Sequence, residues 1–152
     1  MDKIPTPTQQ EESCVLDINF EKAWTQLWTT SLAAIVPKKI KEMKYISGGP
    51  KKVGSTIQIV YMDGAKWDIM VVEISDHRHT LIYQVIKTEP TVKISSIVNI
   101  VKFRKVSTTN QTFMKWTTTF SNDADANAVQ DNKYKKLDFF KEIAEYIAKN
   151  KL

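Results

Sequence analysis

The sequence has little glycine, a single cysteine and no long apolar run. Its 152 residues include four glycines and one cysteine, Cys14. One cysteine excludes an intramolecular disulfide and is typical of proteins of the reducing cytosol. No apolar stretch approaches the ~18 residues that a membrane-spanning helix needs. Residues 1–12 have no apolar core and cannot serve as a secretory signal. We therefore expect a cytoplasmic protein without a membrane-spanning helix.

The motifs of common metal and cofactor sites are missing too. There is no Walker loop, dinucleotide fingerprint or zinc-protease motif. His77 and His79 form an H-x-H pair, but no cysteine or carboxylate cluster accompanies it, and Arg78 would repel a cation. Cys14 has no histidine near it in the sequence, so we expect an ordinary buried thiol. We predict no metal, no cofactor and no catalytic residue.

Positive charge is concentrated in one segment, whereas arginine is scarce. The net charge is +5, and residues 38–52 hold six lysines and one glutamate. Such a patch attracts phosphate or an anionic membrane surface, although a solvated surface is the simpler interpretation. The chain has two arginines, Arg78 and Arg104, and exposed aromatics are not interleaved with the lysines, so we expect no nucleic-acid partner. The lysines of the predicted membrane surface are Lys38, Lys39, Lys41, Lys44, Lys51 and Lys52.

The N-terminal third predicts a tail, a strand and two short helices. Residues 1–12 contain two prolines and two glutamines and are predicted to be disordered, while residues 13–152 form one domain. Residues 13–18 alternate as a strand does. Asn19 is expected to cap a first helix, and a second is expected to end near Pro37.

Apolar runs separated by turns then predict an antiparallel sheet. Asp63-Gly64 between two runs is a strong hairpin signal, and Glu89-Pro90 marks another turn. Connections this short make consecutive strands antiparallel neighbours. Residues 39–47 fit either a strand or a frayed helix. The remaining strands are expected at 55–62, 65–75, 80–87, 91–105 and 111–120.

The C-terminal stretch 131–150 has the period of an amphipathic helix. Lysines and acidic residues between its apolar positions, Lys136 among them, are expected to face water. The sheet is the only large apolar surface that this helix can cover, which predicts an α+β fold. The spacing leaves open whether the helix packs flat on the sheet or spans a hollow. Its expected stripe is Tyr134, Leu137, Phe140, Ile143, Ala144 and Ile147.

Five stretches carry a family resemblance: 46–57, 81–86, 94–101, 114–120 and 145–147. They are similar to stretches of the START-like (SRPBCC) superfamily, in particular the group of the major birch pollen allergen (pathogenesis-related class 10) and polyketide cyclase-like relatives. The resemblance implies the helix-grip fold, in which about seven curved antiparallel strands wrap around a long C-terminal helix and two short helices follow the first strand. It also implies a cavity that takes sterols, fatty acids, flavonoids, cytokinins or polyketides; most members bind and a minority catalyse.

Strand parity and the resemblance together predict which side chains face the helix. We expect them to bind an apolar small molecule, such as a lipid, sterol, fatty acid or aromatic metabolite, as a carrier or sensor. A solid core filled by the same side chains is the alternative. The expected ligand-binding residues are Trp67, Ile69, Leu81, Tyr83, Ile94, Ser96, Val98, Met114, Trp116, Thr118, Phe120, Leu137 and Phe140.

Two further functions are left open. An enzyme of the cyclase, dehydratase or hydrolase kind would need polar groups that converge in the pocket, and the sequence offers Tyr83, Ser96, Thr118 and, at a strand end, Glu73. That interpretation requires Glu73 to lie near Tyr83 and away from solvent. An interaction domain would instead use the basic residues 38–52.

Overall fold

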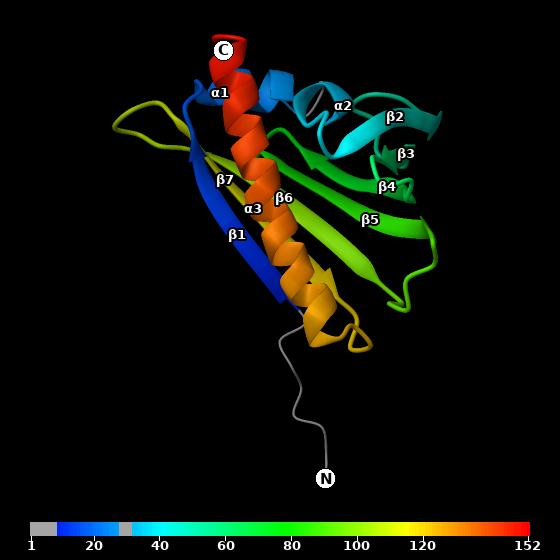
Figure 1. Ribbon diagram of the computed structural model, residues 1–152. Helices are drawn as coiled ribbons and strands as arrows, with labels where there is room; N and C mark the ends of the chain where they lie inside the picture. Colours follow the sequence, from blue (N-terminus) through cyan, green and yellow to red (C-terminus); the bar gives the residue numbers. More distant parts are fainter. Residues whose placement is uncertain (1–8, 28–31) are drawn as a thin grey trace.

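The computed structural model describes residues 9–27 and 32–152, and it shows one seven-stranded antiparallel sheet curved around a long helix (Figure 1). The helix-grip fold and the α+β class are therefore confirmed. The spatial order of the strands is β1-β7-β6-β5-β4-β3-β2. The strands are β1 (Gln9–Leu16), β2 (Ile40–Ser47), β3 (Thr56–Tyr61), β4 (Lys66–Ser75), β5 (Thr80–Glu89), β6 (Ile97–Lys105) and β7 (Thr112–Phe120). The helices are α1 (Phe20–Lys22), the π-helical turn η1 (Ala23–Leu27), α2 (Leu32–Ile35) and α3 (Ala126–Lys149).

The sheet is a meander from β2 to β7, and β1 pairs with β7 to form one edge of the sheet. The predicted hairpin joins β3 to β4, where Gly64 has a φ of 93° and the Asp63 carboxylate accepts a 2.9 Å hydrogen bond from the Ala65 backbone N–H. Residues 40–47 form a strand rather than a frayed helix. The predicted cap is also present: Asn19 Oδ1 accepts a hydrogen bond from the Glu21 N–H at 3.0 Å.

Two strands begin several residues away from their predicted start. The first strand begins at Gln9, so the last four residues of the expected tail belong to the sheet, and residues 1–8 lie outside the described part. The expected strand 91–105 begins only at Ile97. Residues before it form a loop tied to the segment that follows β7, because Asp123 accepts a 3.0 Å hydrogen bond from the Ser95 N–H and Ser121 Oγ accepts a 2.9 Å bond from the Ser96 N–H.

Helix α3 crosses the concave face of the sheet and lies toward the β1 side (Figure 1). It begins at Ala126, earlier than expected, and Asp125 caps it by accepting a 2.7 Å hydrogen bond from the Ala128 N–H. Phe140, Ile143 and Ile147 are buried as predicted. None of the described helices is long and apolar enough to cross a membrane.

The buried stripe of α3 is rotated relative to the prediction. Tyr134 and Leu137 are 55% and 41% exposed, and Ala144 is exposed as well. Lys136, expected in water, is fully buried, and Phe139 takes part in the packing beside the core. Because α3 leans toward β1, the side chains one position away from the expected stripe meet the sheet. Leu137 therefore does not close the space under the helix.

Candidate functional site

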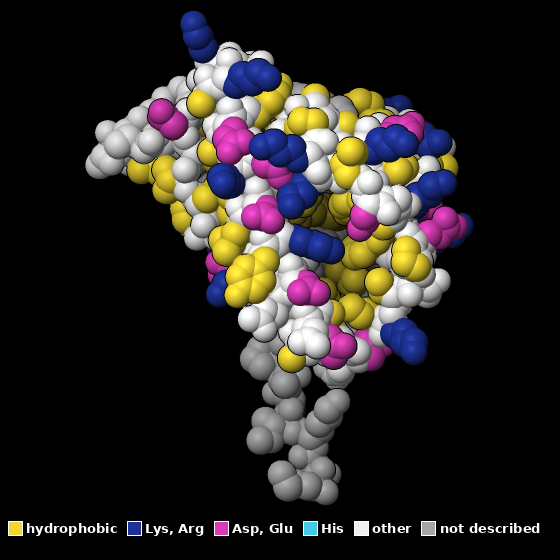
Figure 2. Space-filling model, viewed as in Figure 1, with side chains coloured by type: hydrophobic (Ala, Val, Ile, Leu, Met, Phe, Trp, Pro, Cys, Tyr) yellow, Lys and Arg dark blue, Asp and Glu magenta, His cyan; other side chains and the backbone are white. Residues whose placement is uncertain are grey.

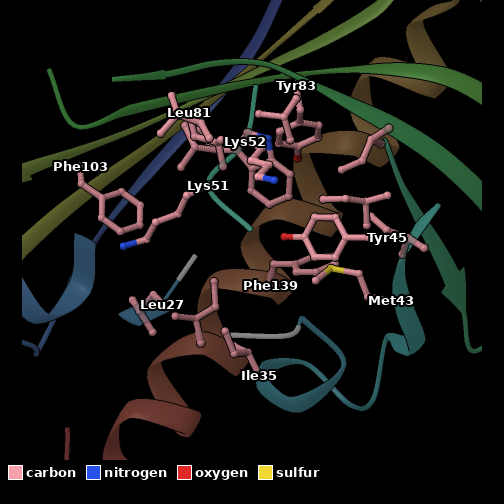
Figure 3. A pocket seen from close by; sticks show the side chains of 18 of the residues that line it. Leu27, Ile35, Met43, Tyr45, Lys51, Lys52, Leu81, Tyr83, Phe103 and Phe139 are labelled. Carbon is pink, nitrogen blue, oxygen red and sulfur yellow. The ribbon is translucent and has the colours of Figure 1, made fainter. Parts of the chain in front are cut away.

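An apolar cavity of about 150 Å³ lies between the concave face of the sheet and α3. Figure 2 shows it as a recess beside α3 in which hydrophobic side chains are visible, and Figure 3 shows side chains from the sheet and the helices converging on it. The core under the helix is thus not completely filled. Its wall on the sheet includes Ile57, Ile59, Ile69, Val71, Leu81, Tyr83, Val101, Phe103, Met114 and Trp116. Its other side includes Leu27, Ile35, Met43, Tyr45, Phe139 and Ile143.

Five of the residues predicted from strand parity line this cavity: Ile69, Leu81, Tyr83, Met114 and Trp116. They come from β4, β5 and β7, where the parity of the strand placed these side chains on the inward face.

Four predicted residues lie near the cavity without lining it. Thr118 and Phe120 are buried on the same strand as Trp116 but beyond the wall. Trp67 is half-buried and packs edge-on against Tyr61, with ring centroids 6.0 Å apart. Phe140 packs against the Trp116 ring from the helix at 6.2 Å.

The predicted inward face of β6 is wrong. Ile97, Asn99, Val101 and Phe103 are the buried residues of this strand, so Val98 points to the opposite face. Ile94 and Ser96 precede the strand and line no part of the cavity. The prediction began the strand too early and took the wrong one of its two faces as the inward face.

Asn99 points inward because its side-chain oxygen accepts two hydrogen bonds behind the cavity wall. Its Oδ1 accepts hydrogen bonds from Trp116 Nε1 at 2.9 Å and from Thr118 Oγ1 at 2.7 Å. Tyr83 is the neighbour of Asn99 on β5, and burial raises the pKa of its hydroxyl, which therefore stays neutral. The one signal in the sequence was an asparagine within an Ile/Val-rich strand, a buried polar residue that needs partners.

The glycine-containing loop between β2 and β3 forms one side of the cavity mouth. Gly48 has a φ of 78°, and a Cβ there would lie 2.2 Å from Ser55 Oγ, so only glycine fits. Ser55 Oγ in turn accepts a 3.0 Å hydrogen bond from the Gly49 N–H. This arrangement places Lys51 and Lys52 at the mouth of the cavity (Figure 3).

The six lysines of the basic segment do not form one surface. Lys38 pairs with Glu145 at 3.9 Å and Lys39 with Asp138 at 3.2 Å, so both lie against α3. Lys41 and Lys44 are exposed on β2, and the other two lysines stand at the cavity mouth. The lysines of this segment that lie away from α3 are therefore Lys41, Lys44, Lys51 and Lys52.

The candidate catalytic groups do not converge. Glu73 is exposed on β4, whereas Tyr83 lines the cavity and Ser96 lies outside it. The pairing of Glu73 with Tyr83 that an acid–base mechanism required is absent from the described residues. Burial raises the pKa of the Cys14 thiol to about 12, which leaves almost no thiolate at neutral pH.

The histidines hold no metal cluster in the described part of the chain, where no group of three or more potential ligand side chains occurs. The His79 ring instead packs edge-on against Phe20 and Trp24, at centroid distances of 4.6 and 5.3 Å.

Lys136 is the unexpected residue of the helix–sheet interface. Its Nζ donates hydrogen bonds to the Gln10 backbone carbonyl at 2.8 Å and to Gln10 Oε1 at 2.6 Å, and lies 5.6 Å from the centre of the Trp116 ring. Burial lowers the pKa of this amine to about 8, while Glu12 and Glu11 act in the opposite direction. Lys136 thus joins α3 to β1 next to the cavity wall.

This depressed pKa predicts a pH-dependent stability. In the unfolded chain the amine has its ordinary pKa of 10.5, so between pH 8 and 10.5 the unfolded state binds more protons than the folded state, and stability rises with pH. Urea unfolding at pH 7 to 10.5 should show the wild type gaining about 1–3 kcal/mol relative to Lys136→Met. Parallel curves for the two proteins would contradict the assignment.

Comparison with known proteins places the fold. The sequence matches no family profile and no curated protein. Among solved structures, a protein from Nitrosospira multiformis superposes with a TM-score of 0.79 at 19% identity, covering 95% of this chain and 99% of the other. Ginseng major latex-like protein 151 from Panax ginseng has a TM-score of 0.71 at 17% identity, covering 95% and 97%. Ara h 8.0201 has a TM-score of 0.72 at 16% identity, covering 93% and 97%. The chain has a helix-grip fold of the birch pollen allergen type.

Proposed function

We propose that this protein binds an apolar small molecule in the cavity between the sheet and α3, as a carrier or sensor. The observation that carries the proposal is the unfilled space itself, which is walled by aliphatic and aromatic side chains. Small-molecule sites have this character, with a few polar groups that orient the ligand. Tyr83 supplies such a group in the wall, and Tyr45 another near the mouth.

The size of the cavity restricts the ligand. At about 150 Å³ it is smaller than the ~300–1,000 Å³ of drug-sized sites and suits a single aromatic ring system. A longer molecule, such as a fatty acid, would place one end inside and extend through the mouth. Lys51 and Lys52 stand there, so an acidic group on the protruding end would meet positive charge. An aromatic or aliphatic acid therefore fits better than a sterol.

The binding test uses 1-anilinonaphthalene-8-sulfonate, an aromatic probe with one negative charge. Val71→Phe places a larger side chain in the cavity, whereas Val72→Phe makes the same change at an exposed position of the same strand. We expect micromolar binding to the wild type and to Val72→Phe, and at least tenfold weaker binding to Val71→Phe. Ligand-dependent change of Trp116 emission should vanish in Trp116→Phe. Equal affinity of both valine variants, or no binding below millimolar probe, would refute the proposal.

A second role, contact with an anionic membrane surface, is favoured by exposed apolar side chains near the lysines of the basic segment. Ile46, near the end of β2, is 52% exposed, and Val53, in the loop that follows, is 62% exposed; Lys44, Lys51 and Lys52 lie in the same stretch of chain. Apolar side chains flanked by lysines are suited to a negatively charged bilayer. Co-sedimentation with phosphatidylserine vesicles should fall with added salt and in Val53→Ser. Vesicle binding that is unaffected by added salt and by Val53→Ser would argue against this role.

A further inference from the structure

A second cleft, of about 490 Å³, lies where β5 begins and β6 ends. Its walls are different in character from those of the apolar cavity, although Phe103 contributes to both. Phe20 provides the other aromatic side chain. The polar residues that line the cleft are Arg78, His79, Thr80, Lys102, Arg104 and Lys105.

Both arginines of the chain face this cleft, although 25 residues separate them in the sequence. The pairing of Thr80 with Lys102 brings their segments together. No acidic residue lines the cleft, and the ion pairs found among the described residues include none of its four cationic side chains. The nearby Asp76 accepts a 2.8 Å hydrogen bond from Trp24 Nε1. Four like charges around one concavity repel one another, and an anion would relieve that repulsion.

The turn that carries Arg78 is held in place. The Arg78 N–H donates to Ser75 Oγ at 3.0 Å, and the Arg78 carbonyl accepts from Thr80 Oγ1 at 3.1 Å. The Phe103 N–H donates to the His79 carbonyl at 2.9 Å, which ties the turn to β6. The backbone of this cleft is thus held by its own hydrogen bonds, so binding would mainly cost the ordering of long side chains.

We propose that this cleft binds a phosphate or sulfate group, independently of the apolar cavity. Guanidinium groups match the oxygens of a tetrahedral oxyanion with two parallel hydrogen bonds, and the lysines add charge. The ligand is either the free inorganic anion or the same group on a small organic molecule. For an aromatic ester, the half-buried Phe20 provides a surface for the ring.

The test is a titration followed by ¹H–¹⁵N NMR at constant ionic strength, with inorganic phosphate, pyrophosphate and phenyl phosphate as probes. We expect saturable shifts at residues 78–80 and 102–105. The double variant Arg78→Gln/Arg104→Gln should bind at least tenfold more weakly. The control Lys41→Gln/Lys44→Gln removes the same charge on β2 and should bind as the wild type does. Arg78→Lys keeps the charge but loses the two parallel hydrogen bonds of the guanidinium, and this variant should bind with intermediate affinity.

The probes also distinguish the source of the anion. Tighter binding of phenyl phosphate indicates an organic ester, and equal binding indicates the inorganic ion. Equal losses in the two double variants, or shifts that sodium chloride reproduces, would overturn the proposal. So would a single-stranded oligonucleotide that binds far more tightly than pyrophosphate and shifts residues beyond the cleft. Retention of the wild-type melting temperature in each variant shows that a loss of binding is not a loss of folding.

Discussion

Replacing Phe140 with alanine is expected to lower the free energy of unfolding by about 3–5 kcal/mol. The side chain is 5% exposed, belongs to the main hydrophobic cluster, and meets the Trp116 ring edge-on at 6.2 Å. It lies in the packed part of the helix–sheet interface and does not line the cavity. Its removal therefore leaves a hole where side chains were in contact on all sides. Urea denaturation followed by circular dichroism measures the loss.

The neighbouring Phe139 is the matched control. It is half-buried and lines the cavity, and its ring lies 5.7 Å from that of Trp116. Part of its surface already faces empty space, so Phe139→Ala should cost only about 1–2 kcal/mol. The same change enlarges the cavity and should alter probe affinity, which Phe140→Ala should leave nearly unchanged. Equal costs for the two variants would mean that the space under the helix is filled in solution.

Asn99→Leu should destabilise the protein by about 2–5 kcal/mol, because it removes the acceptor of the buried Thr118 hydroxyl and of the part-buried Trp116 indole N–H. The Asn99 Oδ1 atom accepts from Trp116 Nε1 at 2.9 Å and from Thr118 Oγ1 at 2.7 Å, and Thr118 is fully buried. Leucine has nearly the same shape, so packing alone would predict little change. The free energy of unfolding and the emission maximum of Trp116 report the effect.

Thr118→Val provides the comparison for this network. It removes one donor and leaves the bond between Asn99 and Trp116, so it should cost only about 1 kcal/mol. The double variant Asn99→Leu/Thr118→Val should be less destabilised than the sum of the two single changes, since one orphaned donor is gone. Strict additivity, or a cost of Asn99→Leu below that of Thr118→Val, would contradict the proposed network.

The facing of each strand was predictable where one face is plainly apolar. On β7 the polar Lys115 separates Met114 from Trp116, and both of these side chains line the cavity as expected. On β6 both faces carry valine and isoleucine, and the prediction took as inward the face opposite to the buried Asn99. Side chains alternate between the two faces of a strand, so an error of one position assigns them all to the opposite face. Only its hydrogen-bonding partners show why an asparagine can be buried there.

The helix was predictable in type but not in rotation. Its period identified a long amphipathic helix, yet Leu137 is exposed and Lys136 is buried. The apolar stripe covers three or four of every seven positions. When the partner surface is unknown, the sequence therefore fits helix orientations that differ by one residue. The backbone and side-chain carbonyl oxygens of Gln10, which is far away in the sequence on β1, accept hydrogen bonds from the buried Lys136 amine. Nothing within the helix itself indicates that contact.

The sequence alone determined the α+β class, the order of elements and the long C-terminal helix, because periodicity and turn residues act over a few neighbouring positions. The tertiary structure alone decided the side on which α3 leans, the size of the space beneath it and the convergence of Arg78 with Arg104. These features depend on pairs of residues far apart in the chain, such as Thr80 and Lys102 or Gln10 and Lys136. Local patterns carry no information on such pairs, since their meeting depends on how the whole sheet curves around the helix.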